Sequence, residues 1–465
     1  MTTSTRDKSP HATLVEIASK LGVDVQSLLV LARSNDPFLA GTSTHWLQAE
    51  WFAALWQRHI PTGSRGHLRR LHYVLVAHSN VQLWDGTPYE NSGTAWGKLK
   101  VASRYARYLG LVAPDELIDE RMGEPQLFTL SREPPPVFAT SSMANVCLPW
   151  IDAQLFPGNF TVPHVGVTGY DYSDADQPYH IELWIEKSTM NDVLLPLCRQ
   201  YGVNLIVGTG TMSITAVVGL LKRAAQHGAC GKATRLFYLS DFDRAGDAMP
   251  RQVSRQIEFW RDRYAPDTDI RLLPLVLTGE QVDRYTLPNA PGESAEHNRR
   301  FEERQQRGVV ELDALEALVP GELGRIVEAA FAPYVDTELA DALHDAEKAA
   351  EAEATRLWEE QTEVLRRSLA AVAAEVTPIG ERYQTQLAEL AKALDEELAP
   401  QREQLRLLKQ VLAELVVTFD PELPERPGAV RREDDGDPWL YDSERNYLKQ
   451  LACYHRHRDG SSGEV

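Results

Sequence analysis

Apolar residues recur at helical spacing through the first 60 residues, in TLVEIASKLG, DVQSLLVLARS and THWLQAEWFAALWQRH. This pattern predicts an N-terminal helical region over residues 1–60. Residues 61–150 then contain a helical pattern (HLRRLHYVLVAH), a loop rich in Gly, Pro and Asn (DGTPYENSG), a second helical pattern (TAWGKLKVASRYARYLG) and short extended pieces. Elements in this order favour a winged-helix (CAP-like) DNA-binding domain over residues 61–150.

From about His180 the pattern changes to short apolar segments that alternate with amphipathic helices. The segments HIELWIE, VNLIVGT, TRLFYLS and IRLLPLVL are predicted strands, and helices are expected near residues 190–201, 213–227 and 247–264. Strands that alternate with helices indicate a parallel sheet covered on both faces, so residues 176–330 are predicted to form an α/β, Rossmann-like domain. In such sheets the ligand site lies beyond the carboxyl ends of the strands.

The last third of the chain has a helical composition followed by a polar tail. Residues 336–417 are rich in Ala, Glu, Leu, Arg and Gln at helical spacing, interrupted at Pro378 and Pro400. We therefore expect a long helical hairpin or coiled-coil arm that mediates assembly. Residues 418–465, with the run PELPERPGAVRREDDGDP, are predicted to be a flexible tail.

The net charge of −19 argues at first against nucleic acid, because phosphate binding usually needs a basic face. The charge is unevenly distributed, however. Between residues 61 and 108 only Asp85 and Glu90 oppose seven basic residues, which are Arg65, Arg69, Arg70, Lys98, Lys100, Arg104 and Arg107. Much of the acid lies between residues 341 and 400, where it is typical of a solvated helical face.

The same basic segment supplies candidate DNA contacts. Lys98, Lys100 and Arg104 recur on one face of a predicted helix, and Arg70 and Arg107 are further candidates. A solvated basic face is the alternative interpretation. The chain has no apolar run long enough for a signal sequence or a membrane span, so a cytoplasmic location is expected. Its four cysteines are far apart and form no CxxC pair, which predicts reduced thiols.

Three acidic residues follow predicted strands. Glu186 closes IELWIE, and Asp241 and Asp243 follow RLFYLS in LSDFDRAGDAM. Carboxylates at the ends of neighbouring parallel strands should converge in one crevice, where a divalent metal relieves their repulsion. Oxygen ligands select Mg²⁺ or Mn²⁺ over zinc. Alternatively, Asp243 is only a turn residue at a helix N-terminus and Glu186 pairs with Lys187 on the surface.

The order of these residues resembles a known family. A Glu at one strand end, followed by DxDxxG after a later strand (Asp241, Asp243 and Gly246), resembles the TOPRIM domain of topoisomerases, primases and related nucleases. More closely, residues 66–330 resemble the A subunit of topoisomerase VI and the meiotic recombination transesterase, and ARYLGLVAPDELIDER and VVELDALEAL look like their stand-alone bacterial and phage relatives. Two features depart from that group: Arg244 and Ala245 replace the usual residues of the DxDPxG form, and no ATPase domain accompanies them.

The resemblance implies a mechanism. In this group a winged-helix domain precedes TOPRIM, and an arginine four residues before a tyrosine marks the nucleophile, a spacing that RRLHY offers as Arg69 and Tyr73. Tyr73 would attack a DNA phosphorus and leave a 5′-phosphotyrosyl bond, while metal held by Glu186, Asp241 and Asp243 stabilises the charge. Arg69 or Arg70 would orient the phosphate, and Glu186 would exchange a proton with the leaving hydroxyl. The resemblance also implies a homodimer in which the tyrosine of one protomer meets the metal site of the other.

Several alternatives remain open. Tyr73 can instead be a helix position that packs with Leu71, Leu75 and Val76. The turn VGTGTMS holds Gly208, Gly210 and Ser213, whose backbone amides either bind a phosphate or serve turn geometry alone.

Three functions follow. The first is Mg²⁺-dependent DNA cleavage by transesterification, as the resemblance implies. The second is a hydrolytic nuclease of a plasmid- or phage-defence system, whose arm docks on an ATPase partner. The third is a DNA-binding or assembly factor without catalysis.

Overall fold

The computed structural model describes residues 9–61, 64–78, 80–118, 125–128, 136–140, 146–152, 154–156, 158–173, 176–208, 210, 212–290, 295–383, 391–430 and 438–459. Contacts divide the chain into two compact units. Unit 1 contains residues 1–129, 178–335 and 431–465, and unit 2 contains residues 130–177 and 336–430. No described helix is long and apolar enough to cross a membrane.

The N-terminal part of unit 1 is helical, as predicted. It consists of α2 (Pro10–Leu21), α3 (Ser43–His59), α4 (Leu68–Ala77) and α5 (Gly93–Tyr108), with short 3₁₀ turns η1 (Val25–Leu28) and η2 (Pro37–Leu39). The helices begin at side-chain caps: the hydroxyls of Ser9, Thr42 and Ser92 accept backbone N–H groups in the first turns of α2, α3 and α5. The apolar faces of α3, α4 and α5 share one core, with Phe52, Leu71 and Leu99 fully buried.

Between residues 64 and 118, the described strands do not form the wing of the predicted winged-helix domain. A wing is an antiparallel hairpin, whereas the strands described between residues 64 and 118 are the two-residue β1 (Gly66–His67) and β2 (Leu117–Ile118), which pair in parallel. The loop between α4 and α5 adds an isolated bridge between Gln82 and Pro88. The described strands between residues 136 and 150, which were predicted to belong to the same domain, are part of unit 2. The predicted boundary at residue 60 is also absent, because α3 packs directly on α5.

The central sheet of unit 1 confirms the predicted α/β class. Its order is β10-β9-β11-β12-β13, and the first four strands are parallel. They are β9 (Tyr179–Ile185), β10 (Asn204–Val207), β11 (Ala233–Leu239) and β12 (Ile270–Val276). β9 and β11 are buried at every position because helices cover both faces, which explains why their sequences show continuous apolar runs rather than alternation.

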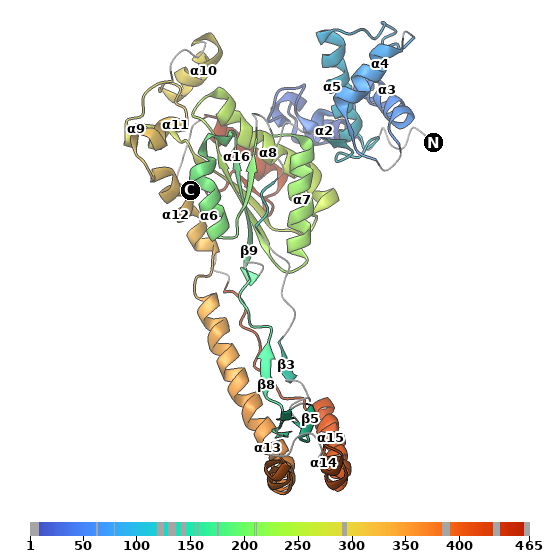
Figure 1. The fold of residues 1–465 in the computed structure, drawn as a ribbon. Coiled ribbons are helices and arrows are strands. Elements are labelled where there is room, and N and C mark those ends of the chain that lie inside the picture. The colour runs from blue at the N-terminus through green and yellow to red at the C-terminus, as the bar shows by residue number, and fades with distance from the viewer. Residues whose placement is uncertain are drawn as a thin grey trace. The chain divides into compact units, whose positions relative to one another are not determined.

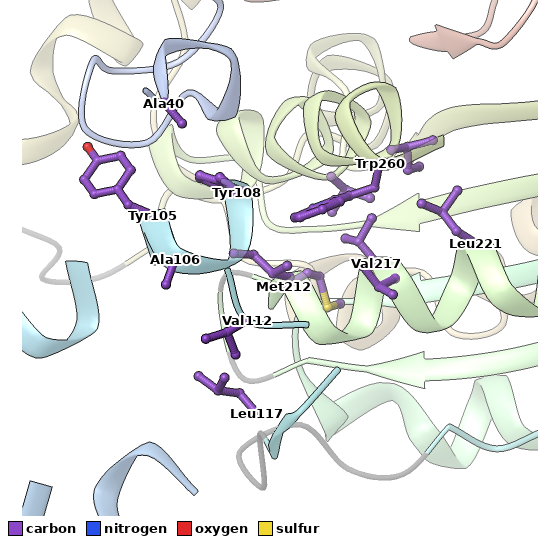
Figure 2. Close-up of a cluster of buried hydrophobic side chains, with 14 of the residues drawn as sticks. Ala40, Tyr105, Ala106, Tyr108, Val112, Leu117, Met212, Val217, Leu221 and Trp260 are labelled. Carbon is purple, nitrogen blue, oxygen red and sulfur yellow. The ribbon is translucent and has the colours of Figure 1, made fainter. Parts of the chain in front are cut away.

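Alternate residues of each strand enter two separate cores. On one face, Trp184 and Tyr238 pack with α7 (Ile214–Gly228), α8 (Arg244–Tyr264) and the N-terminal helices, and Figure 2 shows part of this cluster around Val217 and Trp260. On the other face, Leu183 packs with α6 (Asn191–Gln200) and α12 (Glu322–Phe331). Figure 1 shows α6 and α7 flanking the sheet. The remaining elements of this part are η5 (Ser188–Met190), α9 (Gly279–Tyr285), α10 (Ala295–Gln305), α11 (Asp313–Leu318) and η6 (Ala332–Tyr334).

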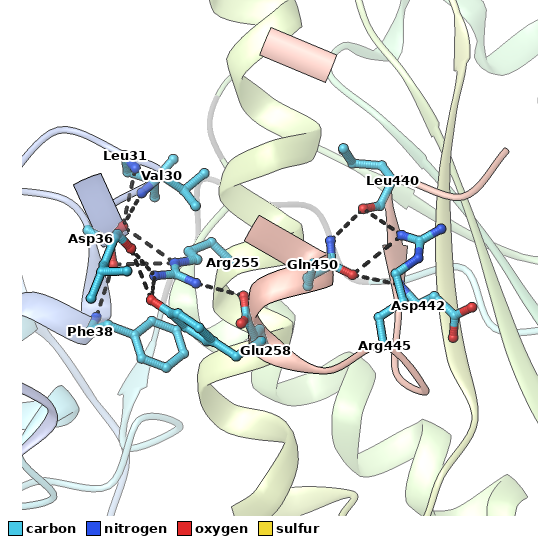
Figure 3. Close-up of polar contacts among 12 residues, drawn as sticks. Val30, Leu31, Asp36, Phe38, Arg255, Glu258, Leu440, Asp442, Arg445 and Gln450 are labelled. Carbon is cyan, nitrogen blue, oxygen red and sulfur yellow. Dashed lines mark hydrogen bonds and ion pairs between the residues drawn. The ribbon is translucent and has the colours of Figure 1, made fainter. Parts of the chain in front are cut away.

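The prediction of a flexible tail is wrong for residues 438–459. β13 (Tyr441–Asp442) pairs antiparallel with β12, and α16 (Tyr447–Asp459) packs on α8. Trp439 is 1% exposed, so the tail completes the second core. Figure 3 shows Gln450 of α16 bonded to Leu440, and Arg255 of α8 held by Asp36 and Glu258. The guanidinium of Arg255 also donates to Tyr447, which ties the N-terminal segment, α8 and the tail together.

Unit 2 confirms the predicted helical arm and adds strands to it. Its helices are α13 (Leu339–Tyr383), α14 (Ala391–Glu397) and α15 (Ala399–Thr418), and α13 packs against α15. Pro378 lies inside α13 and does not end it, while Pro400 lies in the first turn of α15. Three antiparallel pairs precede the arm in sequence: β3 (Val137–Thr140) with β8 (Val165–Thr168), β4 (Val146–Cys147) with β7 (Asn159–Phe160), and β5 (Trp150–Asp152) with β6 (Gln154–Phe156).

A tryptophan joins the strands of unit 2 to its long helix. The indole N–H of Trp358 donates to the carbonyl of Pro163 at 2.8 Å, and its ring packs on Phe419. Trp358 is 1% exposed. The extended segment therefore shares a hydrophobic core with α13 and α15 and forms part of the arm.

Candidate functional site

The predicted convergence of carboxylates rests on strand register. β9 and β11 are neighbours, and Ile185 lies opposite Leu239 in the ladder. Glu186 continues this pairing, since its backbone N–H donates to the carbonyl of Leu239 at 3.2 Å. Glu186 and Asp241 therefore leave the sheet at the same edge, as the sequence predicted.

The carboxyl group of Glu186 is strongly perturbed by its surroundings. Burial and the charges of Asp241 and Asp243 raise the pKa of Glu186 to about 7. Its Oε2 atom is buried and makes no hydrogen bond among the described residues. An uncompensated carboxylate oxygen of this kind is costly unless a cation or a proton reaches it.

Asp241 and Asp243 are each held by backbone. The Leu312 N–H donates to Asp241 Oδ1 at 2.7 Å, and the Gly246 N–H donates to Asp243 Oδ1 at 2.6 Å. Asp243 is thus the N-cap of α8. The predicted alternative, a residue at a helix N-terminus, is correct for the position of Asp243. Gly246 is required because its backbone lies close to Asp241. A Cβ at this position would lie 2.0 Å from the carbonyl oxygen of Asp241, so only glycine fits.

Lys187 is a site residue that the sequence analysis assigned differently. Its Nζ lies 3.0 Å from Asp241 Oδ1 and 2.6 Å from Asp313 Oδ2, with Glu311 Oε2 at 3.8 Å. Lys187 thus forms ion pairs across the site instead of the surface pair with Glu186. The position of Asp313 depends on a backbone pairing between Phe242 and Val310, which no local pattern in the sequence reveals.

The atoms available for binding determine whether a divalent metal fits this site. Among the described residues, no three His, Cys, Asp or Glu side chains are arranged to hold a metal ion as they stand. The donors are all oxygens, however, and Glu186 presents a buried oxygen that lacks a hydrogen bond. By chemistry the set therefore fits Mg²⁺ or Mn²⁺, while Lys187 already neutralises part of Asp241.

A cavity of about 790 Å³ adjoins Asp241 and Asp243. The tail, which was predicted to be flexible, contributes His457 to its lining. Burial and the nearby charges of Arg251 and Arg304 lower the pKa of His457 to about 3, so the ring is neutral at physiological pH. Neither Tyr73 nor Arg69 is among the residues that line this cavity.

A second, larger cleft of about 1000 Å³ in unit 1 gathers positive charge. It is lined by the predicted residues Arg69, Lys100, Arg104 and Arg107, and among the described residues no aspartate or glutamate lines it. Two other predicted DNA contacts lie outside its lining. Lys98 forms an ion pair with Asp85 at 2.7 Å, and Arg70 is exposed beyond the cleft.

The predicted phosphate-binding turn is built differently from the expectation. The N–H groups of Gly208 and Gly210 donate to the carbonyls of Ile185 and Glu186 at 2.7 and 3.3 Å. These amides fasten the turn to the end of β9 and therefore are not directed at a phosphate. Ser213 caps α7 and lines the larger cleft, so it alone of the three reaches a candidate anion site.

Tyr73 is exposed, contrary to the packing alternative. Leu71 and Leu75 are fully buried on one face of α4, whereas Tyr73 is 57% exposed and its ring lies 5.3 Å from that of His72. His72 is fixed in turn, because its Nδ1 lies 2.7 Å from the hydroxyl of Tyr89. An exposed phenol one helical turn after Arg69 is free to meet a substrate.

A scan against models of known protein families and a search of curated protein sequences find no match to this chain.

Proposed function

We propose that the chain is a Mg²⁺-dependent DNA-cleaving enzyme with a TOPRIM-type centre, similar to the topoisomerase VI A group. The observation that carries the proposal is the meeting of Glu186, Asp241 and Asp243 at one edge of a parallel sheet, where two aspartate charges act on the glutamate. Strongly perturbed carboxyls in a cleft are typical of catalytic centres.

Glu186, Asp241 and Asp243 would hold the metal. When bound, Mg²⁺ or Mn²⁺ supplies a positive charge that stabilises the negative charge developing on a phosphate. Glu186 is proposed to exchange a proton with the leaving 3′-oxygen; without metal, its pKa of about 7 keeps both its protonated and its ionised forms populated near neutral pH.

Tyr73 is proposed as the nucleophile. Its phenolic oxygen would form a bond to phosphorus as the bond from phosphorus to the 3′-oxygen breaks, and the phenolic proton would be lost to solvent. Arg69, one turn earlier on α4, is placed to orient the phosphate. Because Tyr73 does not line the carboxylate cavity of its own chain, the proposal requires a homodimer in which each tyrosine serves the partner's carboxylates.

The basic cleft is the proposed path of the DNA backbone. It shares Leu31, Asn35 and Gln252 with a smaller cavity of about 330 Å³ that Arg244 also lines. Since Arg244 directly follows Asp243, the positive lining continues to the residue next to the proposed metal ligands. Cations that line a groove are the groups that bind backbone phosphates.

A hydrolytic nuclease is the second candidate, and one observation favours it. Within one chain the carboxylate cavity lacks Tyr73 among its lining residues, so the same site can act on water instead. In that case the helical arm of unit 2 would dock on an ATPase partner. The third candidate is a DNA-binding or assembly factor without catalysis. In that case the basic cleft would bind DNA, and the carboxylates would not cleave it.

The test is plasmid cleavage with Mg²⁺ or Mn²⁺ by wild type, Asp241→Ala and Tyr73→Phe. Asp262→Ala, at the opposite and exposed end of α8, is the matched control. Samples are quenched with denaturant, with or without protease. We expect cleavage that needs Asp241, and DNA ends that enter the gel only after protease treatment unless Tyr73 is replaced.

Other outcomes select between the candidates. Metal-dependent cleavage by Tyr73→Phe with ends free of protein selects the nuclease. DNA binding that is unchanged in Asp241→Ala, with cleavage absent in every protein, refutes both enzymes and leaves the binding factor.

A further inference from the structure

Lys187 is an ammonium group enclosed by carboxylates. Asp241 Oδ1, Asp313 Oδ2 and Glu311 Oε2 surround its Nζ at 3.0, 2.6 and 3.8 Å. The side chain is 25% exposed. The ammonium group is therefore held by negative charges from three side chains.

The carboxylates around Lys187 are positioned by the fold. The backbones of Phe242 and Val310 bond reciprocally, at 2.8 and 3.0 Å, and this pairing brings residues 311–313 beside Asp241. Leu312 then donates its N–H to the same Asp241 oxygen that meets Lys187. Asp313, at the start of α11, holds the ammonium from the other side. Lys187 is thus fixed on one oxygen of Asp241 by partners that lie more than 100 positions away in sequence.

The occupied oxygen of Asp241 gives this arrangement a role. The ammonium group of Lys187 lies on Asp241 Oδ1, and the negative charges of Asp313 and Glu311 hold it there. Two divalent ions would compete with Lys187 for Asp241 Oδ1.

We infer that Lys187 is the resident second cation of the site, so that the carboxylates take a single divalent ion and Lys187 positions Asp241 for it. This inference rests on the proposed function, because it assumes that Glu186, Asp241 and Asp243 bind metal. It goes beyond that function by setting the metal stoichiometry and by assigning a role to Lys187 and Asp313.

The experiment counts metal ions and does not depend on DNA cleavage. Mn²⁺ binding to the full chain is measured by isothermal titration calorimetry and by the loss of the free-Mn²⁺ electron paramagnetic resonance signal. Wild type is compared with Lys187→Met, which removes the charge at similar length, and with Lys187→Arg, which keeps it. Lys222→Met is the control, since Lys222 is a half-exposed lysine that pairs with Asp115 on the surface of unit 1.

We expect one Mn²⁺ per chain for wild type, Lys187→Arg and the Lys222→Met control. Lys187→Met should bind two Mn²⁺ ions, because the oxygens of its three carboxylate neighbours would then be available to a second ion. Circular dichroism spectra that match wild type establish that the variants are folded. If Lys187→Met loses its fold, Asp313→Asn gives the second test: it removes the anchor of Lys187, so it should let a second Mn²⁺ compete for Asp241.

The remaining outcomes separate the two proposals. Two Mn²⁺ ions on wild type overturn the role of Lys187 and leave the metal-dependent function intact. One Mn²⁺ on wild type and on folded Lys187→Met also overturns the inference alone. No Mn²⁺ on any protein overturns the inference together with the proposed metal centre.

Discussion

The charge on Glu186 should make the metal-free protein less stable as pH rises, and Glu186→Gln should remove this dependence. Burial and the charges of Asp241 and Asp243 raise the pKa of Glu186 from 4.5 to about 7 in the folded chain. Between these two pH values the folded state holds a proton that the unfolded state has released. The free energy of unfolding therefore falls as the pH rises from about 4.5 to about 7.

The magnitude follows from the size of the shift. Each pKa unit corresponds to about 1.4 kcal/mol, which gives an upper value of about 3 kcal/mol for a fully ionised Glu186. The side chain is only partly buried, and solvent screening reduces that figure to about 2 kcal/mol. Glutamine has a similar shape and no charge. Glu186→Gln should therefore match wild type at pH 4.5 and exceed its unfolding free energy by about 2 kcal/mol at pH 8.

The assay is urea unfolding in EDTA at several values between pH 4.5 and pH 8. Asp262→Asn, at the exposed end of α8, is the control for an amide change outside the cluster. An equal difference between Glu186→Gln and wild type at both ends of the range would refute the electrostatic reasoning. Added Mn²⁺ should raise the stability of wild type more than that of the variant, because a ligand stabilises the state that binds it.

Three further predictions concern the cleft, the tail and the glycine beside Asp241. Arg104→Glu should weaken DNA binding about tenfold or more and lower the slope of its salt dependence by about one. Lys98→Glu, outside the cleft lining, should change DNA binding less. Fluorescence anisotropy at several salt concentrations measures both the affinity and the slope. Trp439→Ala should cost about 3–5 kcal/mol in urea unfolding, because a fully buried indole leaves a cavity in the second core. Gly246→Ala should lose Mn²⁺ affinity in calorimetry, since its Cβ displaces Asp241.

The sheet and the meeting of its carboxylates were predictable because each depends on local pattern and simple geometry. Short, largely apolar runs such as RLFYLS between helical patterns are typical of buried strands, and parallel strands place Glu186 and Asp241 at the same edge whatever connects them. The exposure of Tyr73 was undecided in the sequence, because a helix with Leu71 and Leu75 on one face allows either orientation. Only the packing of α4 on α3 settles it.

The remaining features depend on contacts that are distant in sequence. The Asp313 that holds Lys187 comes from a segment 126 positions later, placed by the Phe242–Val310 pairing. The tail carries a polar, Pro-rich run that resembles a linker, yet Trp439 after it fills a core whose other buried residues lie between Tyr179 and Tyr334. The strands of unit 2 are too short to stand out in the sequence, and residues of β3, β4, β7 and β8 pack in one core with α13 and α15.

The acidic composition of the chain and its proposed DNA path are compatible because charge is separated by structure. In unit 2, many acidic residues of the arm are paired within their own helix, as Arg356 is with Glu353 and Glu360 on α13. In unit 1, by contrast, the described lining of the basic cleft has four cations and no carboxylate. Screening limits each charge to about 8–10 Å at physiological salt, so a phosphate in the cleft interacts with the local lining far more than with the net charge of −19. The local balance around Arg104, and not the total, should therefore determine the affinity for DNA.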